Sequence, residues 1–370
     1  MNERHSEAIS EDISEKALWI SLSHTHGVGA QTFCQLLKTF GSPADIYATS
    51  HKKLTEVVSD KIATAISQGI NQATLAESMN WLSNVNNHLV TLADKHYPKA
   101  LLEITDPPPM LYAKGNLVLL NQGSIAIVGS RNASVQGEKN AEAFAYDLCG
   151  YGLCVVSGLA LGIDGAAHRG ALKANGATIA VVGTGLDIVY PAKHRDLAHQ
   201  IAERGLIISE FSLGTPSKPQ NFPKRNRIIS GLSKGCLVVE ANLQSGSQIT
   251  ARLAAEQGRE VFAIPGSIHS PMSKGCHQLI KQGAKLVDCT QDIVEELNLT
   301  NSVSNTPQSD NKSAVPNSPL LNLMGYEPIT LENIVALSGL TVSEVSSMLM
   351  MLELEGRITS LAGNQYQKLS

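Results

Sequence analysis

Short apolar runs that end in clusters of small residues constrain the fold of this 370-residue chain more than any other feature. Five such runs lie between residues 125 and 267, and they begin at Ile125, Cys154, Thr178, Leu237 and Val261. Each run is continuous rather than alternating, as expected for strands of a parallel sheet that helices cover on both faces. The sequence therefore predicts an α/β fold, an extended Rossmann-like core with a mainly parallel sheet.

The residues that follow these strands favour a phosphate-bearing ligand. Ligands of open α/β sheets bind at the carboxyl ends of the strands, where these residues meet. Glycines and serines there leave backbone N–H groups accessible, and the N-termini of the following helices add partial positive charge. These features indicate a phosphate-bearing ligand without identifying its class.

The turns do not match a nicotinamide enzyme or a P-loop ATPase. The dinucleotide fingerprint needs three glycines after the first strand and an acid at the end of the second. Here residues 129–131 read Gly-Ser-Arg, and the second strand ends in Ser-Gly at 157–158. Residues 183–185 read Gly-Thr-Gly, which a tight turn explains better than a cofactor site. The sequence contains no P-loop motif, and we expect no cofactor.

The distribution of charge points to a longer polyanion. The net charge of the whole chain is −4, which by itself argues against nucleic-acid binding. Residues 211–285, however, contain ten lysines and arginines against three glutamates, and residues 223–235 contain no acid. A solvated surface explains such a run about as well as a binding site does. Because apolar Ile228 and Ile229 adjoin the arginines and a strand follows, we expect the arginines near the loop edge of the sheet.

Five motifs are similar to those of the DNA-processing protein A family, also called DprA or Smf. They read GSRNASVQG at 129–137, SGLALGID at 157–164, GTGLDIVYP at 183–191, FPKRNRIISGLS at 222–233 and SGSQITA at 245–251. They occur in the order and spacing of that family. YPKALL at residue 97 and PPPMLY at residue 107 match it too, so that the resemblance covers at least residues 97–297.

The resemblance implies a non-enzymatic protein that binds single-stranded DNA, forms a homodimer through the core and loads the RecA recombinase onto incoming strands in natural transformation. It places a DNA-contacting arginine at Arg131 and a further basic contact at Lys193 or Arg195. The full set of expected DNA-binding residues is Gly129, Ser130, Arg131, Ser134, Ser157, Gly158, Gly183, Gly185, Lys193, Arg195, Phe222, Lys224, Arg225, Asn226, Arg227, Ser245, Gly246, Ser247 and Thr250.

The residue types agree with that implication, although each has a structural alternative. Single-strand binders need cations along a groove and aromatic faces for the bases, and Tyr190 and Phe222 are the candidates for stacking. Packing against a neighbouring helix explains both rings equally well. Arg131 has the alternative of a salt bridge to Asp164 or Glu210. The helix after residue 245 offers either a phosphate seat or an ordinary serine cap.

Other chemistry finds little support in the sequence. The six cysteines form no C-x-x-C pair and are expected to be reduced, buried thiols, so we expect no metal site. Asp164 and His168 have the spacing of an acid–base pair. A carboxylate that interacts with the helix dipole is the better interpretation of Asp164.

Composition divides the chain into four parts. We expect a helical domain of the helix-hairpin-helix or sterile-alpha-motif type at 1–95, the core at 96–297, a flexible linker at 298–319 and a winged helix at 320–370. Charge in the first domain is balanced, so packing is a better explanation for it than DNA contact. The last domain has five glutamates against one arginine and one lysine, which favours a partner-docking or structural role over duplex binding.

Two other functions stay open at this level. One is a nucleotide-binding hydrolase of the lysine-decarboxylase-like group, although residues 245–251 lack the glycine pair of its P-G-G-x-G-T loop. The other is a pure interaction protein with a vestigial pocket. For the homodimer we expect Leu279 or Ile280 in the interface. We expect no membrane span and no signal peptide, and hence a cytoplasmic protein.

Overall fold

The computed structural model describes residues 15–69, 72–299 and 319–369. The chain divides into two compact units, the first ending at residue 302 and the second beginning at residue 303. The linker expected at 298–319 lies, apart from its ends, outside the described residues. The N-terminal residues 1–14, in which we expect no signal peptide, lie outside them as well.

A mixed sheet forms the centre of the first unit, with the strand order β1-β2-β6-β5-β4-β3-β7-β8-β9. The strands are β1 (Asn87–Thr91), β2 (Met110–Gly115), β3 (Ser124–Val128), β4 (Cys154–Ser157), β5 (Thr178–Val181), β6 (Leu206–Ser209), β7 (Gly235–Val238), β8 (Glu260–Ala263) and β9 (Lys285–Leu286). Strands β3 to β9 pair in parallel, whereas β2 is antiparallel to both β1 and β6. The five apolar runs form β3, β4, β5, β7 and β8, which confirms the mainly parallel sheet.

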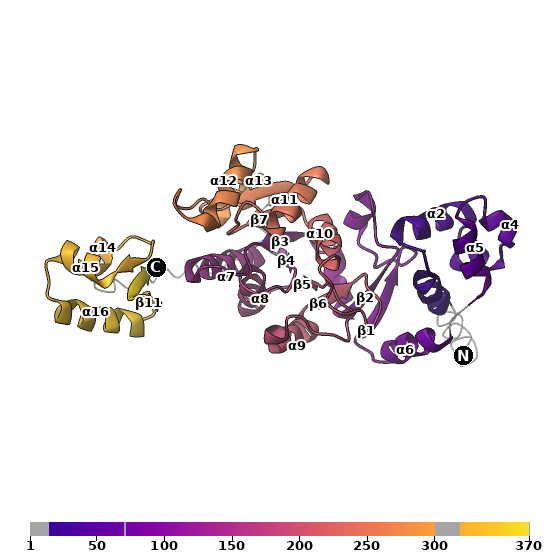
Figure 1. Ribbon diagram of the computed structural model, residues 1–370, viewed down its shortest axis with the longest axis horizontal. Coiled ribbons are helices and arrows are strands. Elements are labelled where there is room, and N and C mark those ends of the chain that lie inside the picture. The colour runs from indigo at the N-terminus through magenta and orange to yellow at the C-terminus, as the bar shows by residue number, and fades with distance from the viewer. Residues whose placement is uncertain (1–14, 70–71, 300–318, 370) are drawn as a thin grey trace. The chain divides into compact units, whose positions relative to one another are not determined.

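Helices cover both faces of this sheet, which explains why the strands are continuously apolar (Figure 1). In β3, Ile125 and Ile127 face one hydrophobic cluster while Ala126 and Val128 face another. The first face carries α7 (Val135–Gly150), α8 (Ile163–Lys173), α9 (Arg195–Arg204) and α13 (Thr290–Glu296). The second face carries α10 (Asn221–Leu232), α11 (Gly246–Glu256) and α12 (Lys274–Lys281).

The direction in which strands are added reverses at β3. Strands β4, β5 and β6 follow on one side of β3, and β7, β8 and β9 extend the sheet on the other. Strands β3 and β7 are therefore neighbours, and the connections that leave their carboxyl ends diverge to opposite faces. In an open α/β sheet this switch point forms the crevice where ligands bind.

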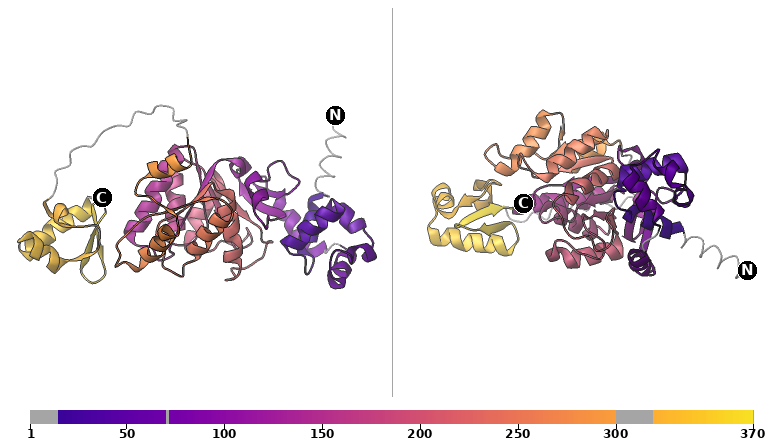
Figure 2. Two further views of the ribbon diagram at one scale, coloured as in Figure 1. Left: turned by 90° about the horizontal axis from the view of Figure 1, so that it is seen from above. Right: turned by 45° about the vertical axis from the view of Figure 1, so that its right-hand side comes forward.

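The N-terminal helices gather at the β1 edge of the sheet (Figure 2). They are α2 (Ala30–Phe40), α3 (Pro43–Ala48), α4 (His51–Leu54), α5 (Asp60–Ser67) and α6 (Gln72–Leu82), preceded by helical residues 15–24. Trp19 stacks on Phe33 at 5.3 Å between ring centroids, and both share a core with Leu89 of β1 and Tyr112 of β2. The division expected at residue 95 therefore falls between two adjacent strands of one sheet.

The second unit is the winged helix that the sequence predicts. It contains α14 (Pro319–Leu323), β10 (Ile329–Thr330), α15 (Leu331–Ser338), α16 (Val342–Leu354), β11 (Ile358–Leu361) and β12 (Gln365–Lys368), with the sheet order β10-β12-β11. The expected capping box opens α16, where Thr341 and Glu344 exchange hydrogen bonds. The short strand β10 was not predicted from the sequence.

No single helix in the described ranges is long and apolar enough to cross a membrane. Helices α15 and α16 together have the length and composition, but they meet at a bend of 110°. Ile334, Val345 and Leu349 of these two helices instead form part of the core of the winged helix.

Candidate nucleic-acid interface

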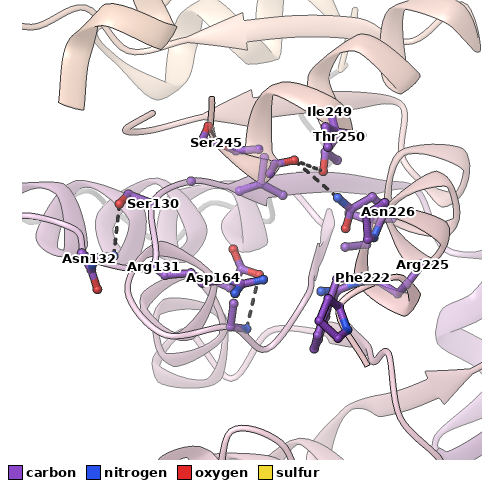
Figure 3. Close-up of a pocket in the computed structure, with 18 of the residues that line it drawn as sticks. Ser130, Arg131, Asn132, Asp164, Phe222, Arg225, Asn226, Ser245, Ile249 and Thr250 are labelled. Carbon is purple, nitrogen blue, oxygen red and sulfur yellow. Dashed lines mark hydrogen bonds between the residues drawn. The ribbon is translucent and has the colours of Figure 1, made fainter. Parts of the chain in front are cut away.

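A pocket of about 590 Å³ opens at the carboxyl ends of β3 and β7 (Figure 3). Its walls come from the loop after β3, the start of α8, the segment that leads into α10 and the N-terminus of α11. The expected residues that line it are Gly129, Ser130, Arg131, Phe222, Arg225, Asn226, Ser245, Gly246, Ser247 and Thr250. Ala160, Asp164 and Tyr190 line it as well, so all five motifs contribute residues at the switch point of the sheet.

Arg131 presents an exposed charge to this pocket. Its guanidinium carbon lies 5.3 Å from the centroid of the Phe222 ring, within the range of a cation–π contact. Glu210, one of the two acids considered as its partner, pairs with Arg227 instead. The loop needs Gly129 because a Cβ atom there would collide with the Ile163 side chain and with the backbone carbonyl oxygen of Glu240, which follows β7. Arg131 is therefore placed for contact with an anion in the pocket.

Asp164 and Arg225 are buried and form the floor of the pocket, where both make hydrogen bonds to the backbone. Arg225 donates to the carbonyl oxygen of Val181, and Asp164 Oδ2 accepts from the N–H groups of Gly158 at 3.1 Å and Ala160 at 3.4 Å. Burial raises the pKa of Asp164, while the Arg225 guanidinium opposes that rise. Burial also lowers the pKa of Arg225 to about 10, so it stays charged at neutral pH. Arg225 thus lies near the loop edge of the sheet, as expected, and lines the pocket, but its side chain is buried and hydrogen-bonded within the fold.

An aromatic pair borders the pocket. The rings of Tyr190 and Phe222 lie 5.7 Å apart and tilted by 41°. Tyr190 is 43% exposed, whereas Phe222 is half-buried between Arg131, Arg225 and the backbone of Gly183. Phe222 is thus held between two arginines at the wall of the pocket, and Tyr190 keeps an open face.

The N-terminus of α11 forms the opposite wall. Ser245 is its N-cap residue but makes no capping hydrogen bond to the helix, and its hydroxyl lies 2.6 Å from that of Ser247. No acid stands in the first turn. The carbonyl oxygen of Gly246 accepts from Asn226 Nδ2 and from Thr250 Oγ1, both at 3.4 Å. This end of the helix therefore offers the pocket a positive dipole without an internal counter-charge.

The N-terminus of α7, by contrast, is already occupied by a carboxylate of the chain. Ser134 caps α7 through the N–H of Gly137 at 2.9 Å. The carboxylate of Glu240 in turn accepts from the Ser134 N–H at 2.9 Å and from its hydroxyl at 2.5 Å. A Cβ atom at Gly137 would collide with that carboxylate. In nucleotide-binding α/β proteins the helix after the first strand holds a phosphate, and here Glu240 fills that position.

Arg227 belongs to a separate ion cluster on the other side of α10. It pairs with Glu210 and lies 3.4 Å from Asp106, and its side chain is only 12% exposed. Burial raises the pKa of Glu210, and Arg227 opposes that rise. The arginine thus neutralises two acids that the fold holds close together, and it lies outside the pocket that contains Arg131.

The other expected residues lie around the pocket rather than in it. Ser157 donates to the carbonyl of Ile127 at 2.6 Å, and Gly158 leaves room for the Arg225 guanidinium. Gly183 packs on the Phe222 ring and Gly185 on the loop at residues 212–214. Lys193, Arg195 and Lys224 are exposed and are not among the pocket residues.

Several pocket residues were not identified from the sequence. These are Val128, Asn132, Ala160, Ser217, Pro219, Pro223, Ile229, Asn242 and Ile249. Asn132 and Ile249 lie within the motifs GSRNASVQG and SGSQITA, so both could have been predicted as pocket residues from the motifs alone. Ser217 and Pro219 lie on a connection with no periodic pattern, and only the folded chain places them here.

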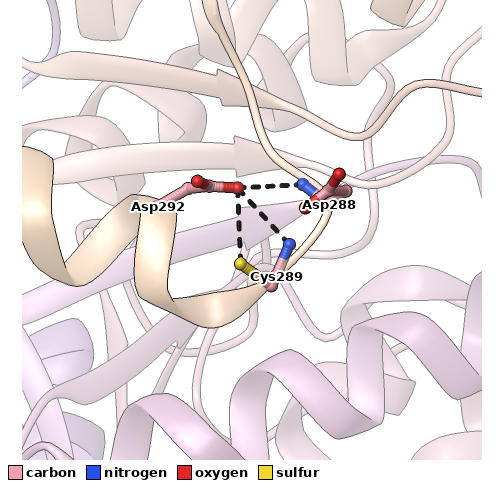
Figure 4. A group of neighbouring side chains, drawn as sticks. All are labelled: Asp288, Cys289 and Asp292. Atoms are coloured by element: carbon pink, nitrogen blue, oxygen red, sulfur yellow. Dashed lines mark hydrogen bonds between the residues drawn. The ribbon is translucent and has the colours of Figure 1, made fainter.

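The alternative chemical groups are used structurally. His168 is fully buried, its Nδ1 lies 2.7 Å from Thr178 Oγ1, and burial lowers its pKa to about 3, which favours a structural role over the acid–base pair with Asp164. Asp288, Cys289 and Asp292 lie close together (Figure 4), but Asp292 accepts the N–H groups of the other two as the capping box of α13. All six cysteines are free thiols. Cys154, Cys236 and Cys276 are buried as expected, but Cys34 and Cys149 are only partly buried and Cys289 is exposed.

Comparison with known proteins identifies the family. Residues 88–298 match the family model described as DNA recombination-mediator protein A, and residues 304–364 match the DprA winged helix domain. The Smf protein of Escherichia coli is 44% identical over 78% of this chain and 79% of its own length. The Smf protein of Synechocystis is 34% identical over 96% of this chain and 99% of its own.

Solved structures agree with this match. The DprA of Streptococcus pneumoniae superposes with a TM-score of 0.68 at 39% identity, over 77% of this chain and 97% of that one. The DprA of Helicobacter pylori, whose structure addresses its single-stranded DNA binding mode, gives a TM-score of 0.52 at 31% identity, over 57% of this chain and 96% of that one. The chain belongs to the DNA recombination-mediator protein A family, DprA/Smf.

Proposed function

We propose that this chain binds single-stranded DNA across the pocket at the switch point of the sheet and acts as a recombination mediator without catalysis of its own. The observation that carries the proposal is the exposed Arg131 guanidinium above the Phe222 ring, opposite the uncapped N-terminus of α11. These two positive elements suit successive phosphates of one strand.

The aromatic pair supplies the second requirement of a single-strand site. Tyr190 presents an open ring beside Phe222, and a base of any sequence can stack on it. Beyond the pocket, Lys193, Arg195 and Lys224 are exposed cations that can extend the path of the backbone. Arg225 and Asn226 support this surface from below, Arg225 by its bond to Val181 and Asn226 by its bond to Gly246.

The competing function, a nucleotide-binding hydrolase, is disfavoured by Glu240. A mononucleotide in such a fold places its phosphate at the helix that follows the first strand. In this chain the Glu240 carboxylate occupies that helix end and would repel a phosphate there. Arg131 and Gly246, at the N-terminus of α11, are both exposed, so a polymer can reach them.

We further propose that the chain works as a cytoplasmic homodimer that loads the RecA recombinase onto the bound strand, as the family resemblance implies. The dimer contact expected at Leu279 needs correction, because Leu279 is only 6% exposed and packs into the core of the sheet. Ile280 is partly buried, and exposed Ile268 and Leu286 lie in the neighbouring chain segments. Sedimentation of the full chain at micromolar concentration tests this point, and a monomer alone would exclude the dimer.

Two assays on one preparation separate the functions. Fluorescent oligonucleotides of unrelated sequence should bind alike, with an affinity that falls as salt rises. Nucleoside mono- and triphosphates should be neither bound tightly nor hydrolysed. Turnover of a nucleotide with weak binding of the polymer would establish the hydrolase, and the absence of both activities would support a pure interaction protein.

A further inference from the structure

The solvent face of helix α16 in the winged helix is apolar. Met350, Met351 and Leu354 are 68%, 63% and 85% exposed. At about 100° per residue these three side chains share one side of α16, opposite the buried side that carries Val345 and Leu349. The solvent side of a helix in a globular domain is normally polar. Packing within the domain therefore does not account for this surface, which we call the α16 stripe (Met350, Met351 and Leu354).

Acidic side chains flank the α16 stripe on both sides. By the same angular spacing, Glu353 lies on one side of it, and Glu344 and Glu355 lie on the other, all exposed. The two bases of the domain are engaged within it. Lys368 donates to a backbone carbonyl at 3.1 Å and lies over a tyrosine ring, and Arg357 lies 4.0 Å from Glu355. The surface is thus an apolar stripe between two negative rims.

We propose that the α16 stripe docks a basic amphipathic helix of a protein partner. Apolar side chains of such a helix would cover Met350, Met351 and Leu354, and its lysines or arginines would meet the flanking glutamates. Methionine side chains adapt to differently shaped apolar partners, which suits this mode of binding. The negative rims repel nucleic acid and anionic lipid, and they also repel the same face of a second copy.

The test uses the full chain and a labelled leucine–lysine amphipathic helix as the probe. We expect saturable binding by fluorescence anisotropy, weakened by salt. A matched peptide with glutamate in place of lysine should bind at least about tenfold more weakly, since its charges face those of the rims. The double variant Met350→Ser/Leu354→Ser should weaken the lysine peptide by about tenfold or more, because two buried apolar contacts are lost.

Two controls keep the result specific to the α16 stripe. Val342→Ser changes an apolar side chain that is 57% exposed on the same helix but lies outside the stripe, and it should bind the lysine peptide like the unchanged chain. Glu355→Gln should weaken the lysine peptide and leave the glutamate peptide no weaker. Circular dichroism verifies that each variant folds.

Three results would overturn the proposal. The first is unchanged binding by the Met350→Ser/Leu354→Ser variant. The second is self-association of the unchanged chain that this variant abolishes while the peptide fails to bind, because a second copy would then cover the stripe. The third is binding to phosphatidylcholine vesicles that the same variant abolishes, because a membrane would then be the occupant.

Discussion

Replacement of Arg227 by alanine is expected to damage the fold rather than the DNA surface. The substitution would leave Glu210 and Asp106 close together without the cation that neutralises both. Removing one partner of a buried ion pair costs about 3–5 kcal/mol. The side chains of Arg227 and Glu210 are each 12% exposed, so we expect the lower end of that range, about 3 kcal/mol.

The pH dependence of this cost identifies its cause. Burial raises the folded-state pKa of Glu210 above its ordinary value of 4.5, so the folded chain holds this proton more firmly than the unfolded chain. The stability that such a group contributes is fully present below the unfolded-state pKa and is lost as pH rises through the folded-state pKa. Without Arg227 the folded-state pKa rises further. The cost of Arg227→Ala should therefore be smallest at and below pH 4.5 and grow as pH rises through the folded-state pKa of Glu210.

Urea unfolding followed by tryptophan fluorescence measures this cost, because both tryptophans, Trp19 and Trp81, lie in the first unit. The double variant Arg227→Ala/Glu210→Gln should recover much of the loss, since the uncompensated buried charge is gone. Lys224→Ala, on the exposed side of the same helix, is the matched control and should change stability little. Full stability of Arg227→Ala, together with a reduced salt dependence of DNA binding, would refute this reasoning and make Arg227 a phosphate ligand.

Three further predictions concern the pocket and the winged helix. Glu240→Ala should lower the free energy of unfolding by about 1–3 kcal/mol, because the Ser134 hydroxyl and N–H lose their acceptor; urea titration checks this, and an unchanged midpoint would contradict it. Tyr190→Ala should weaken single-strand binding by about 1–3 kcal/mol with an unchanged salt slope, since stacking rather than charge is lost; equal affinity in a fluorescence titration would show that no base stacks there. Deletion of residues 320–370 should leave single-strand affinity nearly unchanged, and a large loss would overturn our interpretation of the acidic winged helix.

Five of the seven parallel strands, β3, β4, β5, β7 and β8, could be predicted from the sequence because burial on both faces leaves a continuous apolar run. The short strands β6 and β9 were not predicted. Strands β1 and β2 could not be predicted in the same way. They pair antiparallel at the edge of the sheet, and the residues that cover them, such as Trp19 and Phe33, come from the N-terminal helices. The apolar pattern within residues 87–115 therefore does not reveal that the N-terminal helices bury these two strands.

The site was predicted at the level of segments but not at the level of individual side chains. The motifs predicted that the loop after β3, the start of α10 and the start of α11 meet at the carboxyl edge of the sheet. In the structure all three segments line one pocket. The basic run at residues 223–235 did not reveal which cations are free. The position of each residue on α10 decides whether its charge is available to a ligand. Arg225 is bonded to the Val181 carbonyl oxygen, Arg227 pairs with Glu210 and Asp106, and Lys224 is exposed to solvent. The three roles differ because the three residues face different sides of α10 relative to the sheet. Amino-acid composition does not predict which side each residue faces.

The salt dependence of single-strand binding by Arg131 variants tests the proposed interface most directly. Arg131 is exposed, so Arg131→Ala should fold with unchanged stability while its salt slope falls by about 0.7, the value for one lost phosphate contact on a single strand. Arg131→Lys keeps the charge but loses the planar group over Phe222, and it should restore the slope more fully than the affinity. A slope for Arg131→Ala equal to that of the unchanged chain would mean that the strand does not cross this pocket.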